Sequence, residues 1–206
     1  GYKSCLCAIN HCVRIVEPHV LIITETWLHH GVRDSEVVPT TYRLFRRDRE
    51  SRGGGVAIAI RKNIRSLELD GIPDNESIWC KLTYCNKSVT VGGIYRPPNA
   101  APDYIEMIHD HLLKHTNSKS NIILVKDFNL PGINWTNNSH DGHDVTSSEL
   151  LLDVAFTFSL NQLVTDNTQI TSTSSSLLDL AFVSSTLEGS SVSIENSISD
   201  HKVIFF

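Results

Sequence analysis

Five polar residues near the ends of apolar runs carry the most informative chemistry in this sequence. They are Glu25, Asp127, Asn129, Asp200 and His201. If each apolar run forms a buried strand, side chains at the strand ends can converge on one rim of a sheet, where ligands commonly bind in layered α/β domains. Carboxylates, an amide and a histidine supply ligands for a hard cation and a group that shuttles protons. These residue types therefore indicate a site that cleaves phosphoesters.

Asp127 and Asn129 flank Phe128, so in an extended backbone both side chains point to the same face of a strand. A carboxylate and an amide so placed can hold a phosphate, a water molecule or a cation. The same residue types also favour a simple turn after a strand, and this alternative stays open. Glu25 can reach a cation from the end of its strand without being buried unpaired, although most glutamates are ordinary surface residues.

His201 is the natural candidate for an acid or base, because the ordinary pKa of histidine lies near neutrality. Such a histidine needs a carboxylate to orient it. Asp179 is the candidate, since an aspartate between two leucines in an apolar strand is costly to bury unless it is paired. Asp200 is better placed on the side of the cation. Taken alone, Asp200-His201 would be interpreted as an ordinary loop dipeptide.

Two arginine-containing segments are candidates for binding phosphate. Tyr95 and Arg96 end a predicted strand with a phenol and a guanidinium, both of which suit a phosphate. The sequence also contains one basic cluster, formed by Arg43, Arg46, Arg47, Arg49 and Arg52. Asp48 and Glu50 interrupt this cluster, so it is interpreted either as a solvated hairpin or as a contact to the phosphate backbone of a nucleic acid.

The hydrophobic pattern predicts the elements that position these residues. Strands are predicted at 19–24, 56–60, 77–83, 89–95, 121–125, 177–183 and 192–194, and helices at 5–16, from 102 and from 146. A polar turn at 86–88 makes the third and fourth strands a hairpin, and Thr146 with Glu149 matches a capping box. The segment 171–176 is predicted to be a loop. Strands mixed with a few helices indicate sheet layers covered by helices.

Composition limits the classes of protein to consider. The chain has 206 residues, enough for one domain with a real core. Its formal net charge of -5 argues against a generic nucleic-acid coat protein but not against a nuclease, whose cation ligands add acidity. No apolar run approaches the roughly 20 residues that span a bilayer, and no secretory leader is recognised. The five cysteines are interpreted as reduced thiols of an intracellular protein.

Six segments now form a pattern in one order. They are Ile23-Thr24-Glu25-Thr26-Trp27-Leu28, Arg52-Gly53-Gly54-Gly55-Val56-Ala57, Tyr95-Arg96-Pro97-Pro98, Asp127-Phe128-Asn129-Leu130-Pro131, Leu178-Asp179-Leu180 and Ser199-Asp200-His201. Together they closely resemble the endonuclease domain of non-LTR (LINE-type) retrotransposons, within the endonuclease/exonuclease/phosphatase superfamily. The resemblance implies a four-layered α/β sandwich, with two packed mixed β-sheets flanked by helices, as in deoxyribonuclease I and the apurinic/apyrimidinic endonucleases.

The resemblance also implies an activity and a set of partners. It implies a DNA endonuclease that nicks target DNA, depends on Mg²⁺ with Mn²⁺ as an alternative, and is fused upstream of a reverse transcriptase domain in a polyprotein. The expected location is intracellular, in the nucleus, with no membrane association. Two alternatives are kept. One is a catalytically inert retroelement remnant that at most binds DNA, and the other is a small-molecule phosphatase of the same superfamily.

The resemblance assigns roles to individual residues. Glu25 resembles the principal cation ligand, with Asp200 nearby. Asp127 and Asn129 resemble the pair that positions or activates the attacking water, and Tyr95 would contact the scissile phosphate. His201, oriented by Asp179, would act at that phosphate. Whether Asp127 or His201 is the general base stays open. Contacts to DNA or phosphate are expected from Arg96, Arg46, Arg47 and Arg49.

Three departures from the family pattern lead to further expectations. The chain begins at Gly1, so the family's first strand, which carries an asparagine, is expected to be missing. It ends five residues after His201, so the last strand is expected to be incomplete. Residues 1–206 are therefore expected to form a single domain that lacks its first strand and extreme C-terminus. Lys126 replaces a glycine before Asp127, and its ammonium is expected either to pair with that carboxylate or to point to solvent.

Overall fold

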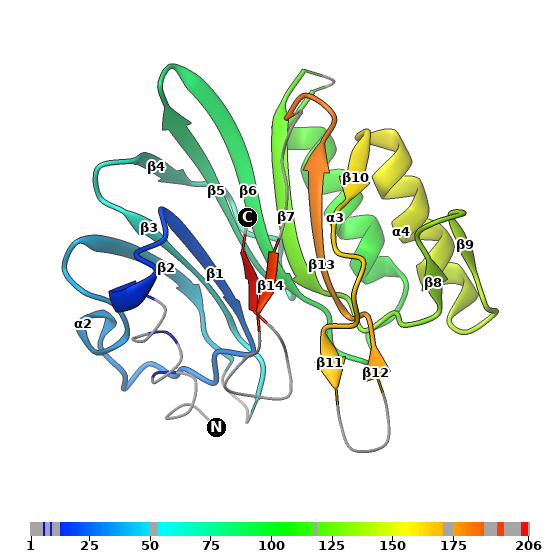
Figure 1. Cartoon of the computed structure of the whole chain (residues 1–206), viewed down its shortest axis with the longest axis horizontal. Coiled ribbons are helices and arrows are strands. Elements are labelled where there is room, and N and C mark those ends of the chain that lie inside the picture. Colours follow the sequence, from blue (N-terminus) through cyan, green and yellow to red (C-terminus); the bar gives the residue numbers. More distant parts are fainter. Residues whose placement is uncertain are drawn as a thin grey trace. The chain divides into compact units, whose positions relative to one another are not determined.

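A computed structural model gives the fold of this chain (Figure 1). It describes residues 6, 9, 13–49, 53–117, 119–170, 175–187, 193–195 and 203–205. The chain divides into two compact units, Gly1–Tyr95 and Arg96–Phe206, and each unit is described by itself. Asp200 and His201 lie outside the described residues.

The first unit contains a three-stranded antiparallel sheet. Its order is β1 (Val20–Thr24), β3 (Val56–Arg61) and β2 (Tyr42–Arg47). The apolar residues of β3 are completely buried, as expected for a central strand covered on both faces. The register pairs Thr24 with Val56 and Val56 with Arg47. The last residues of β1 and β2 therefore lie in one row, on either side of the first residue of β3.

The strands β4 (Arg65–Glu68), β5 (Glu76–Tyr84) and β6 (Lys87–Tyr95) pair in that order and are antiparallel. The β5–β6 hairpin turns at Cys85 and Asn86, both of which have positive φ, as a two-residue type I′ turn requires. The hairpin predicted from the sequence is confirmed, with its turn one residue earlier than expected. Because of this turn, the register places Glu76 opposite Tyr95.

The two groups of strands in the first unit pack against each other: β1 contacts β6, and β2 and β3 contact β5. Gly93 marks the closest approach, since a Cβ atom there would lie 2.7 Å from Cγ2 of Ile22. On another side of the unit, α2 (Asp34–Val37) and the helical residue Val13 join an apolar cluster. Its buried members are Ile9, Val13, Leu28, Val32, Val37, Val38, Tyr42 and Ala59.

The second unit contains β10 (Leu160–Gln162), β13 (Asp179–Ser184) and β7 (Asn121–Asp127), paired in that order and antiparallel. Two helices, α3 (Asp103–His115) and α4 (Val145–Thr157), pack against each other, and α4 also contacts β10. Three short antiparallel pairs complete the unit. They are β8 (Ile133–Asn134) with β9 (Ser139–His140), β11 (Gln169–Ile170) with β12 (Ser175–Ser176), and β14 (Ser193–Glu195) with β15 (Val203–Phe205).

Most predicted elements are confirmed, including the α/β class with packed sheets and few helices. The prediction missed β2, because three of its six residues are arginines and hide the apolar pattern. The capping box was wrong: α4 begins after Asp144, whose φ is 42°, so Thr146 lies inside the helix. Ser175 and Ser176 form a strand where a loop was predicted.

No helix among the described residues has the length and apolar character needed to cross a membrane.

Candidate active site

In the first unit, Glu25 begins a strained turn directly after β1. Glu25 and Trp27 have φ values of 51° and 54°, in the left-handed region that residues other than glycine rarely adopt. The backbone amides of Thr26 and Trp27 donate to the carbonyl oxygens of Gly55 (3.2 Å) and Gly54 (3.0 Å). Strain of this kind persists only where the surroundings impose it, and it clusters at functional sites. The glycine segment before β3 thus holds the turn that carries Glu25.

Glu76 in turn holds the glycine segment. Its Oε2 accepts a hydrogen bond from the Gly55 amide (2.6 Å), and its Oε1 accepts one from Nε of Arg49 (2.8 Å) within an ion pair. Glycine is required at position 54, where φ is 68° and a Cβ atom would lie 2.5 Å from Arg49 and Glu76 side-chain atoms. The role of Glu76 was missed in the sequence. The register of a two-residue turn at 85–86 could have revealed it, since that register places Glu76 opposite Tyr95.

Arg49 links Glu76 to two of the candidate catalytic residues. Its guanidinium carbon lies 5.6 Å from the centre of the Tyr95 ring. The hydrogen bond with Glu76 raises the pKa of Arg49. Burial lowers this pKa, and the charges of Glu76, Tyr95 and Glu25 raise it further. One electrostatic cluster is therefore formed by Glu25, Arg49, Glu76 and Tyr95.

In the second unit, Asp127 and Asp179 are directly opposite each other on β7 and β13. Asp127 is almost fully buried, and its Oδ1 accepts a hydrogen bond from the Asn129 amide (3.1 Å). Asn129 has a φ of 50° and donates from Nδ2 to the Arg96 carbonyl (2.8 Å). The segment is therefore a turn closed by the aspartate side chain, the alternative left open by the sequence, and not an extended strand. The turn still places Asn129 against Asp127.

The backbone at Asp179 is held by a threonine that the sequence analysis did not single out. Oγ1 of Thr168, which is completely buried, accepts hydrogen bonds from the amides of Leu178 (3.2 Å) and Asp179 (2.9 Å). The Leu178 carbonyl accepts a hydrogen bond from the Phe128 amide (3.2 Å). The strand ends at Asp127 and Asp179 are thereby tied together beyond their regular pairing. The expected partner of Asp179, His201, lies outside the described residues.

Arg96 is completely buried, and protein acceptors bind both terminal nitrogens of its guanidinium, while Nε has no hydrogen-bond partner among the described residues. It donates to the carbonyls of Phe128 (3.3 Å) and Ala100 (2.7 Å), to Oγ of Ser147 (3.0 Å) and to Oδ2 of Asp144 (2.8 Å). Burial alone would raise the pKa of Asp144, but hydrogen bonds from Ser147 and Arg96 hold that pKa below its ordinary value. This arrangement favours a structural role for Arg96 and argues against a contact with phosphate.

Lys126 is buried, with 1% of its surface exposed. Its Nζ has no hydrogen-bond partner among the described residues and lies 3.4 Å from the ring centre of Phe128 and 5.1 Å from that of Tyr104. Both expectations for Lys126 were wrong, because it neither hydrogen-bonds to Asp127 nor points to solvent. Burial lowers the pKa of this amine well below its ordinary value. The positive charge of Arg96 lowers the pKa further, and the negative charge of Asp127 raises it.

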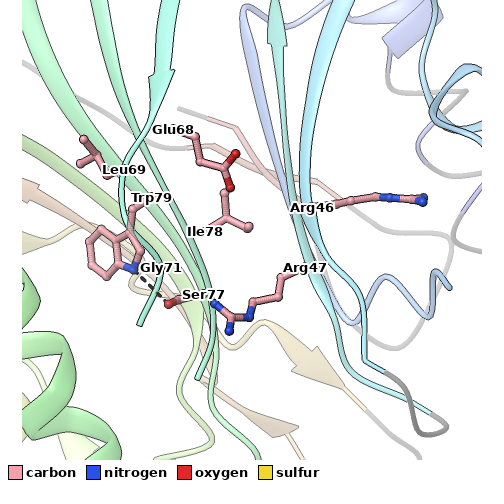
Figure 2. Close-up of a pocket in the computed structure, with 8 residues that line it drawn as sticks. All are labelled: Arg46, Arg47, Glu68, Leu69, Gly71, Ser77, Ile78 and Trp79. Carbon is pink, nitrogen blue, oxygen red and sulfur yellow. Dashed lines mark hydrogen bonds between the residues drawn. The ribbon is translucent and has the colours of Figure 1, made fainter. Parts of the chain in front are cut away.

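Arg46 and Arg47 are adjacent in sequence but differ in their surroundings. Arg46 donates to the Val32 carbonyl (2.8 Å) and forms ion pairs with Asp34 (3.3 Å) and Asp48 (3.5 Å). Among the described residues, the Arg47 guanidinium makes no hydrogen bond or ion pair. It lines a cavity of about 260 Å³, and Figure 2 shows it pointing toward Ser77 while Arg46 points away. Arg46 also lines this cavity, and the other lining residues are Glu68, Leu69, Gly71, Ser77, Ile78 and Trp79.

Residues 89–205, more than half of the chain, match the model of the endonuclease-reverse transcriptase family. The chain belongs to this family. Among curated proteins, no sequence matches the chain. The family assignment confirms the resemblance drawn from the six sequence segments, and family and fold are those of phosphodiester-cleaving hydrolases.

Solved structures of other proteins share the fold of this endonuclease-reverse transcriptase family member. One is the endonuclease domain of TRAS1, a telomere-specific non-LTR retrotransposon, with a TM-score of 0.73 and 15% identity over 98% of this chain and 91% of that chain. Another is an AP endonuclease from Archaeoglobus fulgidus, with a TM-score of 0.69 and 14% identity over 100% and 95%. A third is D. rerio TDP2 complexed with single-strand DNA product, with a TM-score of 0.62 and 13% identity over 98% and 90%.

The residues of this family member offer oxygen ligands suited to a hard cation. The described residues contain no cluster of three or more His, Cys, Asp or Glu side chains arranged to hold a metal. Mg²⁺ does not need such a cage, because it is usually bound through one or two carboxylates and keeps several waters. The half-exposed Glu25 carboxylate, on a turn held by hydrogen bonds, fits this requirement. The other expected ligand, Asp200, lies outside the described residues.

Proposed function

We propose that this chain is a divalent-metal-dependent DNA endonuclease that nicks target DNA by hydrolysing a phosphodiester bond. The observation that carries the proposal is the pairing of Asp127 with Asp179, with Asn129 bound to Asp127, in a member of the endonuclease-reverse transcriptase family. A downstream reverse transcriptase domain, which the name of the family supports, and a nuclear location are part of the same proposal.

Asp127 and Asn129 act on the attacking water in this proposal. The Asn129 amide donates to Oδ1 of Asp127, which fixes the orientation of the carboxylate. An oriented carboxylate can accept a proton from water as a general base and can align the water for attack. His201, oriented by Asp179, is the alternative base, or the acid that protonates the leaving oxygen.

Mg²⁺, or Mn²⁺ in its place, would be held by Glu25 and Asp200. When bound, the cation offsets the negative charge that develops on the phosphate oxygens during displacement. Tyr95 would donate its phenolic proton to the scissile phosphate. The guanidinium of Arg49 lies 5.6 Å from the centre of the Tyr95 ring, a cation–π contact that places a positive charge beside this phenol.

Arg47 is the arginine of the basic cluster that best suits a contact with the DNA backbone. Arg47 is partly exposed and lines a cavity, and its guanidinium has no ion pair among the described residues. Arg46 and Arg49, which the sequence analysis also assigned to DNA, are bound to carboxylates within the protein. A cation that has no partner in the free protein can pair with phosphate without first breaking another interaction.

The test is relaxation of supercoiled plasmid by the purified protein with Mg²⁺, with Mn²⁺, and with either metal plus a chelator. Metal-dependent conversion to the nicked circle is expected. No nicking with either metal would contradict the proposal. Binding of duplex DNA, measured by fluorescence anisotropy, would then identify an inert remnant. Release of inorganic phosphate from soluble phosphoesters would identify a phosphatase.

A further inference from the structure

Two successive sets of contacts support the turn that carries Glu25. Neither set is made by the side chains assigned to the reaction. The first set is made by the Gly54-Gly55 segment, whose carbonyls bind the amides of Trp27 and Thr26. The second is the ion pair between Arg49 and Glu76, which binds the Gly55 amide through Oε2 of Glu76. The contacts therefore run from Arg49 through Glu76 and the glycine segment to the turn that carries Glu25.

We propose that Arg49 and Glu76 are positioning residues for the metal ligand Glu25, acting through the Gly54-Gly55 segment that holds the Glu25–Trp27 turn in its left-handed conformation. The inference rests on the proposed function, in which Glu25 binds the divalent cation. It gives Glu76 a positioning role behind the metal ligand and gives Arg49 an internal role in place of a contact with DNA.

The backbone of the turn explains why Glu25 needs this support. Two of three consecutive residues, Glu25 and Trp27, have left-handed φ values, so the turn would relax to another conformation without fixed acceptors for its amides. Residue 26 adds to the constraint, because Thr26 is completely buried and its Oγ1 accepts a hydrogen bond from the Leu28 amide (3.3 Å). A relaxed turn would point the Glu25 carboxylate in many directions.

The acceptor for the Gly55 amide is a carboxylate that a second residue holds in place. A carboxylate accepts hydrogen bonds on both oxygens, so Glu76 can bind the Gly55 amide and Arg49 at the same time. Arg49 fixes the carboxylate because its Nε and Nη2 both donate to Oε1 of Glu76. The single ammonium of a lysine cannot reproduce this pair of hydrogen bonds. Arg49 also neutralises the charge of Glu76, which would otherwise repel Glu25 in the same cluster.

The experiment measures metal binding directly in the whole chain. Binding of Mn²⁺ is followed by the electron paramagnetic resonance signal of the free ion, for the wild type, Glu76→Ala, Glu76→Gln and Arg49→Lys. Loss of groups that orient a metal ligand typically weakens metal affinity by roughly 10- to 100-fold. We expect about 10-fold weaker Mn²⁺ binding for Glu76→Ala and a smaller loss for Glu76→Gln, which keeps an acceptor for the Gly55 amide. Arg49→Lys should also lose less than Glu76→Ala.

A second readout follows the turn itself. Amide hydrogen exchange of Thr26 and Trp27 should become faster in Glu76→Ala, because their acceptors are no longer held. Glu17→Ala is the matched control, since it removes an ion pair with Arg61 (3.0 Å) at the opposite end of β3 and should change neither readout. Circular dichroism checks that every variant is folded, and Glu76→Gln keeps the test decisive if Glu76→Ala does not fold.

The outcomes separate this inference from the proposed function. If the wild type binds Mn²⁺ and Glu76→Ala binds it equally well, the positioning role is contradicted while the proposed function stands. Unchanged amide exchange at Thr26 and Trp27 in that variant also contradicts the positioning role. If the wild type binds no Mn²⁺ and does not nick plasmid, the proposed function fails, and the assignment of Arg49 and Glu76 to metal positioning falls with it.

Discussion

Asp127 and Asp179 face each other across the antiparallel strands β7 and β13, although they are far apart in the sequence. Directly opposed residues on neighbouring strands have Cβ atoms about 5 Å apart. Two carboxylates at this separation repel each other unless hydrogen bonds or cations stabilise them. The Asn129 amide supplies one such hydrogen bond to Asp127. The pair is therefore suited to the proposed hydrolysis, which requires carboxylates that handle protons or cations.

The acid-base assignment predicts a change in rate without a change in binding. His201→Ala should lower the nicking rate by about 100- to 10,000-fold, the usual contribution of general acid-base catalysis, and should leave DNA affinity nearly unchanged. Asp179→Asn should also lower the rate, because the imidazole loses the carboxylate that orients it. Plasmid nicking kinetics and fluorescence anisotropy measure the two quantities separately.

Asp166→Asn is the control for Asp179→Asn, since Asp166 is exposed in the loop before β11. It should nick at the rate of the wild type. Unimpaired nicking by His201→Ala would remove His201 from the reaction and leave Asp127 as the general base.

The basic strand β2 predicts a difference between two neighbouring arginines. Arg47→Ala should weaken DNA binding and lower the slope of log affinity against log salt by roughly one unit, as expected for one lost phosphate contact. Arg46→Ala should leave the slope unchanged but lower thermal stability, because Arg46 binds the Val32 carbonyl and two aspartates. Anisotropy titrations at several salt concentrations measure the slope.

Arg65→Ala controls for the loss of one positive charge, since Arg65 is exposed on β4. If Arg47→Ala and Arg65→Ala have the same salt slope as the wild type, Arg47 is a solvated residue and does not contact DNA.

The buried Lys126 predicts a more stable variant. Lys126→Met keeps the length of the side chain and removes a buried amine that has no hydrogen-bond partner among the described residues. Burying such a group costs roughly 1–3 kcal/mol, so the free energy of unfolding should rise by a similar amount at neutral pH. Urea unfolding measures this gain, and exposed Lys119→Met is the control that should show no gain.

The gain from Lys126→Met should depend on pH with a definite sign. The folded-state pKa of Lys126 lies below its ordinary value of 10.5, so between the two values the unfolded chain binds a proton that the folded chain does not. Stability of the wild type should therefore rise as the pH increases toward 10.5, and the advantage of methionine should shrink. A gain that is constant from pH 7 to pH 10 would show that burial does not perturb the amine.

The buried Arg96 predicts a loss of stability in the second unit. Arg96→Ala would leave the carbonyls of Phe128 and Ala100, Ser147 and Asp144 without their donor. The Asp144 side chain is 39% exposed and can be solvated, so the expected loss of about 1–3 kcal/mol comes mainly from the buried acceptors that lose their donor. Thermal unfolding measures it. A variant as stable as the wild type that binds DNA more weakly would restore the phosphate role of Arg96.

The local sequence pattern determined most of the secondary structure and the family. Apolar runs of strand length predicted β1, β3, β7 and β13, because a buried strand needs a continuous apolar segment wherever it lies in the fold. The order of six short segments identified the family, since spacing along a chain is a property of the sequence alone. The pattern also placed Glu25 and Asp127 at the ends of strands.

The tertiary structure alone decided the roles of the charged residues. Arg46, Arg47 and Arg49 look alike in the sequence. In the fold, Arg46 binds α2 and its neighbouring loop and Arg49 binds Glu76, whereas Arg47 has no ion pair among the described residues. Lys126 gives no sequence signal of burial, and its surroundings depend on α3 and Phe128. The physical reason is that alternation along a strand determines only the face of the sheet on which a side chain lies. The partner of that side chain depends on which distant segment packs against that face.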